Sequence, residues 1–345
     1  RFHGFNASDS TGHLRVLHDE IASSDALVIG GDPFDDSHTD TQVDPFRGIL
    51  PYAANLITLA KYLQKKIILF GIHLGRKPTS PYGIALTKFC LDNATLVTTR
   101  EDDTKEELVR TYGVAPEKVI SSADSGFALL RHAKPSSSQR LAALFSRAAL
   151  APKNYIALTV RSYYWFWSDT EAKAYTEKFA AYADRLASVH NRKVLLLPHC
   201  AYELDNYWES DINFQREIYE QCKEKKHIVP IDFYLSSEEL LHCIEQATCL
   251  VSNRRHSGIY ASLLGIPFYL FGEWNHVGKV YTSLGITPKD FVDERSLGRL
   301  FSDPKMRHLH DALEGWDAKH ARANALAQEK KCAYATDSMY ALLNT

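Results

Sequence analysis

The chain has 345 residues, which exceeds the usual size of a single domain, and 45% hydrophobic with 24% charged residues is the composition of a globular protein. A formal net charge of -2 excludes a general nucleic-acid binder, because such proteins carry a basic excess. The apolar stretches are of strand length and fall well short of the roughly 20 residues of a membrane span. Six cysteines without a CxxC pair indicate reduced thiols in the core rather than a zinc site.

In the first half of the chain, strand-length apolar runs alternate with helical patterns, which indicates βαβ units and a parallel sheet. The predicted strands cover residues 25–30, 66–71, 96–100 and 118–121, and the predicted helices cover residues 50–64, 84–91 and 103–112.

A Ser- and Lys-rich segment after Ala133, followed by Pro152, is typical of a domain connection, so we place a boundary near residue 150. The second half repeats the alternation of strands and helices. Its predicted strands cover residues 155–161, 193–198, 227–230, 249–253 and 267–271, and its predicted helices cover residues 169–190, 212–224, 237–246 and 257–264. The last helical stretches, residues 296–303 and 316–343, have a pattern suited to packing back across the first domain.

This order of elements predicts an α/β protein with two facing doubly wound, Rossmann-like domains, residues 1–150 and residues 151–345. In such sheets ligands bind at the carboxyl ends of the strands, where the next helix offers unpaired N–H groups to an anion. We therefore expect the functional residues at strand ends.

One strand end, within residues 250–267, is strongly basic. Arg254, Arg255 and His256 follow a predicted strand directly, and an apolar helix is expected to begin at Ser257. Arginine matches the geometry of carboxylates and phosphates, and histidine exchanges protons near neutral pH. The alternative is an Arg-rich turn that caps the helix or pairs with acidic neighbours. Since helix N-termini usually carry acidic residues, we favour an anion site.

The same segment resembles the polysaccharide pyruvyl transferase family, in which a strand is followed by S-x-R-x-H, a helix and a G-x-P turn. The matching positions are Ser252, Arg254, His256, Gly265 and Pro267. Further elements resemble the family in the expected order: residues 24–31, 99–101, 123–127, 197–199 with Asp205, and 278–280.

The resemblance implies a two-domain fold like that of the B-type nucleotide-sugar glycosyltransferases (GT-B). It also implies transfer of the enolpyruvyl group of phosphoenolpyruvate onto sugar hydroxyls as a ketal, with release of phosphate. The first domain would bind the acceptor and the second the donor. We expect no cofactor, and the expected partners are phosphoenolpyruvate and a glycan or lipid-linked saccharide.

The site residues follow from the resemblance together with the strand-end positions. The expected catalytic residues are Arg161, Arg254 and His256; the arginines would bind the donor, and the histidine would move protons. The expected substrate contacts are Lys279, Arg255, Ser257, Gly30, Gly31, His73, His199 and Asp124.

Other interpretations of single segments stay open. Arg161 also suits a surface arginine that begins a loop, and the aromatic residues 163–167 either stack on a sugar or fill an interdomain interface. His73 is followed by Arg76 and Lys77, which could also meet the acceptor. An acidic loop could hold a metal, but solvated loop acidity is the commoner meaning and we expect no required metal; its residues are Asp35, Asp36, His38 and Asp40. His199 has possible acidic companions in Glu203 and Asp205.

The chain departs from the family pattern at Asp32, where a glycine is usual, at Arg255, where an aliphatic residue is usual, and at Ser257, where a glycine is usual. The family's first βα unit is also expected to be missing or trimmed. Two alternatives follow: a GT-B glycosyltransferase that binds ribose through Glu238 or Glu239, and a non-catalytic glycan-binding relative. We expect a cytoplasmic protein, or one of the Golgi lumen if an N-terminal anchor was removed, and the sequence leaves a homo-oligomer open.

Overall fold

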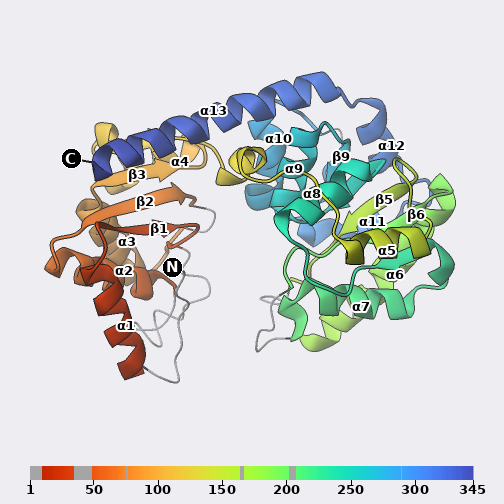
Figure 1. Cartoon of the computed structure of the whole chain (residues 1–345), viewed down its shortest axis with the longest axis horizontal. Helices are drawn as coiled ribbons and strands as arrows, with labels where there is room; N and C mark the ends of the chain where they lie inside the picture. The colour runs from red at the N-terminus through yellow and green to blue at the C-terminus, as the bar shows by residue number, and fades with distance from the viewer. Residues whose placement is uncertain are drawn as a thin grey trace. The chain divides into compact units, whose positions relative to one another are not determined.

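The computed structural model describes residues 10–34, 49–74, 77–163, 167–201, 207–288 and 290–344. The chain divides into two compact units (Figure 1). Unit 1 comprises Arg1–Ser125 with Gln328–Thr345, and unit 2 comprises Gly126–Ala327. The chain passes from unit 1 to unit 2 after Ser125, whereas the composition led us to expect a boundary near residue 150. The last residues of the chain return to unit 1.

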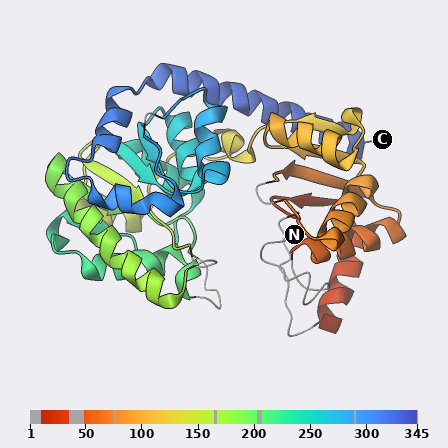
Figure 2. The same cartoon turned by 180° about the vertical axis from the view of Figure 1, so that it is seen from behind.

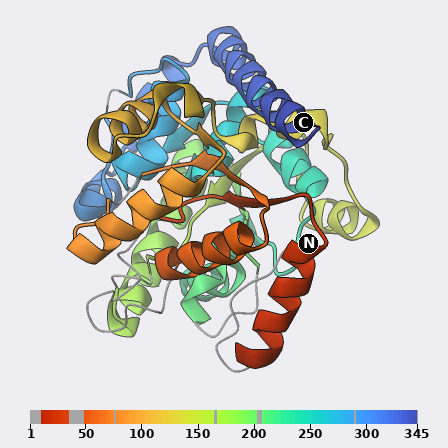
Figure 3. The same cartoon turned by 90° about the vertical axis from the view of Figure 1, so that its left-hand side faces the viewer.

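Unit 1 is built on a four-stranded parallel sheet of order β1-β2-β3-β4. The strands are β1 (Ala26–Gly30), β2 (Lys66–Ile72), β3 (Leu96–Thr99) and β4 (Val119–Ser121). The helices are α1 (Ser10–Ala22), α2 (Ile49–Tyr62), α3 (Pro81–Asn93), α4 (Asp102–Tyr112) and the last part of α13 (Ala318–Leu343), as Figure 3 shows from the side. The predicted doubly wound alternation is present throughout these residues.

The strand β2 explains why this sheet forms. Its sequence KIILFGI is almost continuously apolar, as expected for a strand covered on both faces, and Ile67, Leu69 and Ile72 lie in the core with residues of α2 and α3. The register between β2 and β3 shifts after Leu69, where Gly71 has a φ of 62° that glycine tolerates. The irregularity ends β2 directly before His73.

Unit 2 is built on a five-stranded parallel sheet of order β7-β6-β5-β8-β9. The strands are β5 (Tyr155–Thr159), β6 (Lys193–Leu196), β7 (Ile228–Pro230), β8 (Cys249–Ser252) and β9 (Phe268–Leu270). The helices are α5 (Gln139–Arg147), α6 (Asp169–His190), α7 (Asp211–Gln221), α8 (Ser237–Gln246), α9 (Arg255–Leu264), α10 (Lys279–Ser283), α11 (Leu297–Ser302) and α12 (Arg307–Glu314).

Helices cover both faces of the unit 2 sheet. On one face, apolar side chains of β5, β6 and β9 form a continuous core with α6, α7, α11 and α12, and Figure 2 shows α6 lying across this face. On the other face, α8 and α9 contact one another, and α9 contacts β8 and β9. The central strand β5 is fully buried along its length. Its carboxyl end lies in the middle of the sheet edge at which the parallel strands of unit 2 end.

Two helices of unit 2 begin with a capping box, a pattern that can be seen in the sequence. Ser168 and Glu171 cap α6, and Ser236 and Glu239 cap α8, each serine accepting a backbone N–H and each glutamate accepting one in return. The predicted ranges 169–190 and 237–246 are confirmed.

The predicted fold class, α/β with parallel sheets in two units, is confirmed. Among the described helices, none combines the length and apolar character required for a transmembrane segment. All six cysteines are free thiols, and all but Cys200 are buried.

Candidate functional site

The basic segment of unit 2 lies where β8 ends and α9 begins. Arg254 occupies the N-cap position of α9, and its backbone N–H donates to the hydroxyl of Ser252 at 2.8 Å. The side chain of Arg254 does not cap the helix. The first N–H groups of α9 and a guanidinium therefore lie at the same strand end, and both favour an anion.

A buried carboxylate, Asp211 at the start of α7, fixes Arg254. Asp211 is 1% exposed; its Oδ1 accepts a hydrogen bond from Nη2 of Arg254, and its Oδ2 accepts from the backbone N–H groups of His199 at 3.0 Å and Cys200 at 2.9 Å. These donors satisfy a carboxylate that would otherwise be costly to bury. No pattern in the sequence indicates this role, because an aspartate in the first turn of a helix usually stabilises that helix's own N-terminus.

Arg161 follows β5 and lies beside Arg254. Its backbone is clamped by the buried Asn253, whose Oδ1 accepts from the N–H of Arg161 at 2.9 Å and whose Nδ2 donates to the carbonyl of Arg161 at 3.0 Å. Burial, together with repulsion from Arg254, lowers the pKa of Arg161 to about 10. Arg161 still carries its charge at neutral pH, so two cations lie at neighbouring strand ends.

His199 and Ser257 form a hydrogen-bonded pair, with 2.9 Å between Nε2 and Oγ. Burial, then the charges of Arg254 and His256, hold the pKa of His199 well below its ordinary value. His199 is therefore a neutral imidazole at physiological pH. The ring of Tyr260 lies parallel to that of His199, 6.2 Å away, and 6.0 Å from that of His256.

These side chains surround a pocket of about 290 Å³ in unit 2. Arg254, His256 and His199 line it, and His256 is exposed to solvent. Other lining residues come from the segment before α8 and the first turn of that helix. The complete lining is His199, Cys200, Tyr234, Leu235, Ser236, Ser237, Leu240, Arg254, His256 and Tyr260.

Three of the predicted substrate contacts are not among the residues that line this pocket. Arg255 is 2% exposed, and its Nη1 donates to the carbonyl of His276 at 3.2 Å. Ser257 is fully buried against His199, and Lys279 is the first residue of α10, which contacts α9. Substrate contacts from these three residues stay predictions.

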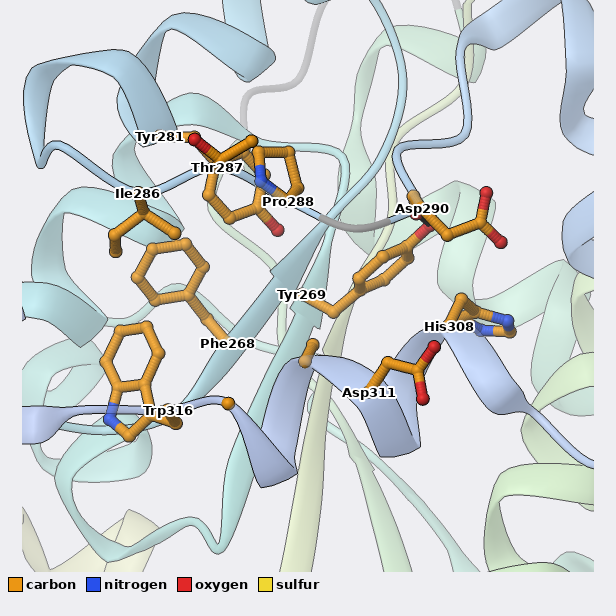
Figure 4. A pocket seen from close by; sticks show the side chains of 12 residues that line it. Phe268, Tyr269, Tyr281, Ile286, Thr287, Pro288, Asp290, His308, Asp311 and Trp316 are labelled. Atoms are coloured by element: carbon orange, nitrogen blue, oxygen red, sulfur yellow. Dashed lines mark hydrogen bonds between the residues drawn. The ribbon is translucent and has the colours of Figure 1, made fainter.

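A second hollow in unit 2, of about 110 Å³, has a different chemistry (Figure 4). Phe268, Tyr269, Tyr281 and Trp316 contribute aromatic rings to its walls. Two of its polar groups have partners: Oη of Tyr269 donates to the carbonyl of Asp290 at 2.9 Å, and Nε2 of His308 is 3.0 Å from Oη of Tyr182. Among its described lining residues there is no lysine or arginine. An anionic donor therefore fits the pocket at Arg254 better.

Further predicted site residues lie at the strand ends of unit 1. Gly31, with a φ of 89°, follows Gly30 at the end of β1. His73 follows β2, and its Nδ1 is 2.9 Å from Oε2 of Glu101. Asp124 is 1% exposed and lies 3.7 Å, oxygen to nitrogen, from Nη1 of Arg100. Arg100 and Glu101 were noticed in the sequence only as part of a motif, and the structure brings both into this cluster.

Some sequence predictions fall outside the described residues. These are the acidic loop with Asp35, Asp36, His38 and Asp40, the aromatic residues 164–166, Arg76, and the companions of His199, Glu203 and Asp205. Within the described ranges, no group of three His, Cys, Asp or Glu side chains is arranged to hold a metal ion.

Comparisons with known proteins support the fold and identify the family. The sequence matches the family model "Polysaccharide pyruvyl transferase" over residues 3–275. A search of curated proteins found no match.

Solved structures with the same fold include a putative UDP-N-acetylglucosamine 2-epimerase from Listeria monocytogenes, at 10% identity and a TM-score of 0.63, covering 99% of this chain and 81% of that one. UDP-GlcNAc 2-epimerase from Neisseria meningitidis, solved with UDP-GlcNAc bound, matches at 9% identity and a TM-score of 0.60, covering 97% and 83%. An α,α-trehalose-phosphate synthase from Burkholderia vietnamiensis matches at 14% identity and a TM-score of 0.53, covering 99% and 78%. These identities establish a GT-B-like fold and nothing about activity. Because the family model covers most of the chain, this protein belongs to the polysaccharide pyruvyl transferase family.

Proposed function

We propose that this protein transfers the enolpyruvyl group of phosphoenolpyruvate onto two hydroxyls of a sugar as a ketal and releases phosphate. One observation carries the proposal: Arg254, at the N-terminus of α9, is fixed by the buried Asp211 and lines a pocket together with His256. Family membership supports the reaction type, and the chemistry of the pocket supports the donor.

The donor carries a carboxylate and a phosphate, so its site must supply several positive groups. Arg254 offers a planar guanidinium beside the first N–H groups of α9. Arg161 adds a second cation, whose pKa is lowered by burial and by Arg254. An anion bound near both guanidiniums would relieve their repulsion, which favours the dianionic or trianionic donor over a neutral molecule.

In the proposed reaction, one sugar hydroxyl adds to C2 of phosphoenolpyruvate while a proton is delivered to the C3 methylene, which becomes a methyl group. A second hydroxyl then displaces phosphate from C2. Two C–O bonds to sugar form, the C2–O bond to phosphate breaks, and the two hydroxyl protons end on the methyl group and on phosphate.

His256 is the proposed proton carrier, because its imidazole is exposed and lines the pocket with Arg254. His199 is less suited to this role. Its Nε2 is engaged by the hydroxyl of Ser257, and its lowered pKa disfavours the protonated form that a proton donor needs.

The glycosyltransferase alternative needs a free carboxylate for a ribose at the start of α8. Oε2 of Glu239 accepts from the backbone N–H of Ser236 at 2.8 Å, and Oε1 accepts from the hydroxyl of Ser138. Both oxygens of Glu239 thus have hydrogen-bond partners, which disfavours Glu239 as the ribose ligand and leaves Glu238 as the carboxylate for that alternative.

The test measures thermal stabilisation by phosphoenolpyruvate and by UDP, and phosphate release with a panel of oligosaccharides. Phosphoenolpyruvate should raise the Tm of the wild type, and Arg254→Ala should lower its affinity by about 10- to 100-fold, the effect of losing a charge-assisted hydrogen bond. His256→Ala should keep donor binding and lose phosphate release.

Arg216→Ala is the matched control, because Arg216 is an exposed arginine of α7 in the same unit. It should behave like the wild type. Stabilisation by UDP but not by phosphoenolpyruvate, or full activity in both Arg254→Ala and His256→Ala, would refute the proposal.

A further inference from the structure

The aromatic hollow of unit 2 is separate from the pocket at Arg254. It lies at β9, the edge strand of the sheet, and its other walls come from α12, which contacts β9, and from the segment after α10. None of its described lining residues also lines the pocket at Arg254. The proposed transfer reaction therefore does not use this hollow.

Aromatic side chains that pack on one another form the apolar end of the hollow. The ring centroid of Phe268, which is 1% exposed, lies 4.9 Å from that of Trp316 and 5.5 Å from that of Tyr281. Ile286 and Pro288 complete this end. An apolar cavity of about 150 Å³ holds one benzene molecule, so a hollow of about 110 Å³ takes a slightly smaller apolar body.

The other end of the hollow is polar and acidic. Figure 4 shows Asp290, His308 and Asp311 at this end, on the far side of the Tyr269 ring from Trp316. Asp290 forms an ion pair with the exposed Arg299. The carboxylate of Asp311, on α12, makes no hydrogen bond or ion pair with another described residue. One carboxylate in the wall thus has its hydrogen-bonding capacity available.

The charges around the hollow favour a cation. Burial lowers the pKa of His308, so its imidazole is neutral at physiological pH, and the described lining residues include no lysine or arginine. An anion would be repelled by Asp311, whereas an ammonium group can donate charge-assisted hydrogen bonds to it. The faces of aromatic rings such as Tyr269 also attract cations.

We propose that this hollow binds a small protonated amine, whose ammonium group donates to Asp311 beside the ring of Tyr269 and whose apolar body packs between Phe268, Ile286 and Trp316. The site takes a ligand of the opposite charge from the donor pocket in the same unit. It is therefore a second binding site, and the amine is not a substrate of the proposed transfer.

The test compares three probes with the same five-carbon ring and different charge: cyclopentylamine, cyclopentanol and cyclopentanecarboxylate. Ligand-observed NMR titrations of the full chain at pH 7, where an alkylamine is protonated as a lysine side chain is, give the affinity of each. Cyclopentylamine should bind at least about tenfold more tightly than cyclopentanol, the effect of a hydrogen bond to a charged group. Cyclopentanecarboxylate should bind more weakly than both.

Asp311→Asn removes the charge and keeps the size of the side chain. It should lower the affinity for cyclopentylamine by about tenfold and leave that for cyclopentanol within about twofold, so that the preference for the amine disappears. Because Asp311 is half-buried and makes no contact that the substitution would break, the variant is expected to fold, and its Tm without ligand checks this. Ala312→Leu, which adds bulk to the wall, should weaken binding of both the amine and the alcohol.

Glu314→Gln is the matched control, because Glu314 is an exposed carboxylate of the same helix and does not line the hollow. It should bind cyclopentylamine like the wild type. Equal affinity for the amine and the alcohol, preference for the carboxylate, unchanged amine affinity in Asp311→Asn, or no binding of any probe would overturn the proposal. Stabilisation by phosphoenolpyruvate is measured separately through Arg254, so each of these results leaves the donor assignment standing.

Discussion

The carboxylate of Asp211 holds the guanidinium of Arg254 while its second oxygen accepts two backbone N–H groups from the segment after β6. One buried side chain thus connects the start of α7, the end of β6 and the end of β8. This arrangement fixes the arginine in place before any ligand arrives. Preorganised cations of this kind lose little conformational freedom when an anion binds.

Asp211→Asn should therefore affect both stability and donor binding. Removing one partner leaves a largely buried guanidinium without its counter-charge, which destabilises a protein by about 3 to 5 kcal/mol. Urea unfolding measures this change, and the rise in Tm with phosphoenolpyruvate should fall in the variant. The control is Asp92→Asn, whose exposed pair with Lys88 should be worth at most about 1 kcal/mol. Equal losses in both variants would contradict a special role for Asp211.

His199 should make the stability of unit 2 depend on pH. Burial, with Arg254 and His256, holds the pKa of His199 well below its ordinary value in the folded protein, while the unfolded chain has the ordinary value near 6.5. Between those two values the unfolded state binds more protons. Stability contributed by the neutral imidazole is therefore present above about pH 6.5 and is lost as the pH falls, with a slope approaching about 1.4 kcal/mol per pH unit.

Chemical unfolding of the wild type and of His199→Gln at several pH values tests this dependence. Glutamine can still hydrogen bond to Ser257 but does not titrate, so the variant should lose less stability than the wild type below about pH 6.5. Burial also lowers the pKa values of His190, His242 and His308, and these remain in both proteins. The difference between the two curves thus reports His199, and parallel curves would disprove its contribution.

Gly272→Ala should disturb the donor site indirectly, through Tyr163 and Asn253. Gly272 follows β9 with a φ of 112°, and a Cβ there would lie 2.2 Å from Oη of Tyr163 and 3.6 Å from Cβ of Asn253. The strained backbone and the clash should cost about 2 to 4 kcal/mol and shift the clamp that Asn253 makes on Arg161.

Gly298→Ala is the matched control for that substitution. Gly298 lies in α11, and no atom would come within 4 Å of an added Cβ. Alanine should there stabilise the helix by up to about 1 kcal/mol. Thermal unfolding compares the two variants, and a neutral Gly272→Ala would mean that Tyr163 moves aside without penalty.

The sequence predicted much of the fold because local signals and burial agree in it. The strands alternate with helices as expected, and the capping boxes at Ser168 and Ser236 define the starts of α6 and α8. The helix α12 was missed. It starts after Met306, which has a left-handed conformation and makes no side-chain cap. Its polar residue His308 is buried against Tyr182, so the sequence pattern of α12 does not indicate which side of the helix is buried.

The sequence predicted at which strand ends the site residues lie, but it did not predict which residues contact one another. Arg254 and His256 were found because two arginines and a histidine follow an apolar run and match the S-x-R-x-H pattern of the family. The roles of Asp211 and Asn253 depend on contacts between residues more than 40 positions apart. The contact of His73 with Glu101 likewise depends on the irregular end of β2 at Gly71. No local pattern in the sequence encodes such pairings.

Arg255 tests which residues of the basic segment bind the donor and which stabilise the fold. Sequence spacing groups it with Arg254, but α9 begins at Arg255, two residues earlier than its apolar pattern indicates, and the helix turns this side chain into the interior. Its Nη1 donates to the carbonyl of His276, so we expect Arg255 to join α9 to the segment before α10.

Arg255→Met and Arg254→Met should therefore differ in donor affinity, although both should lower the free energy of unfolding, because Arg254→Met leaves the buried Asp211 without its counter-charge. Methionine at position 255 should lower the free energy of unfolding by about 1 to 3 kcal/mol, because a buried hydrogen bond to a carbonyl is lost, and leave phosphoenolpyruvate affinity within about threefold of the wild type. Methionine at position 254 should lower that affinity by about 10- to 100-fold. Urea unfolding and ligand-induced Tm shifts measure both quantities. If Arg255→Met instead abolishes donor binding while the protein remains folded, the second arginine binds the anion as well, and its place inside the unit must change when the donor arrives.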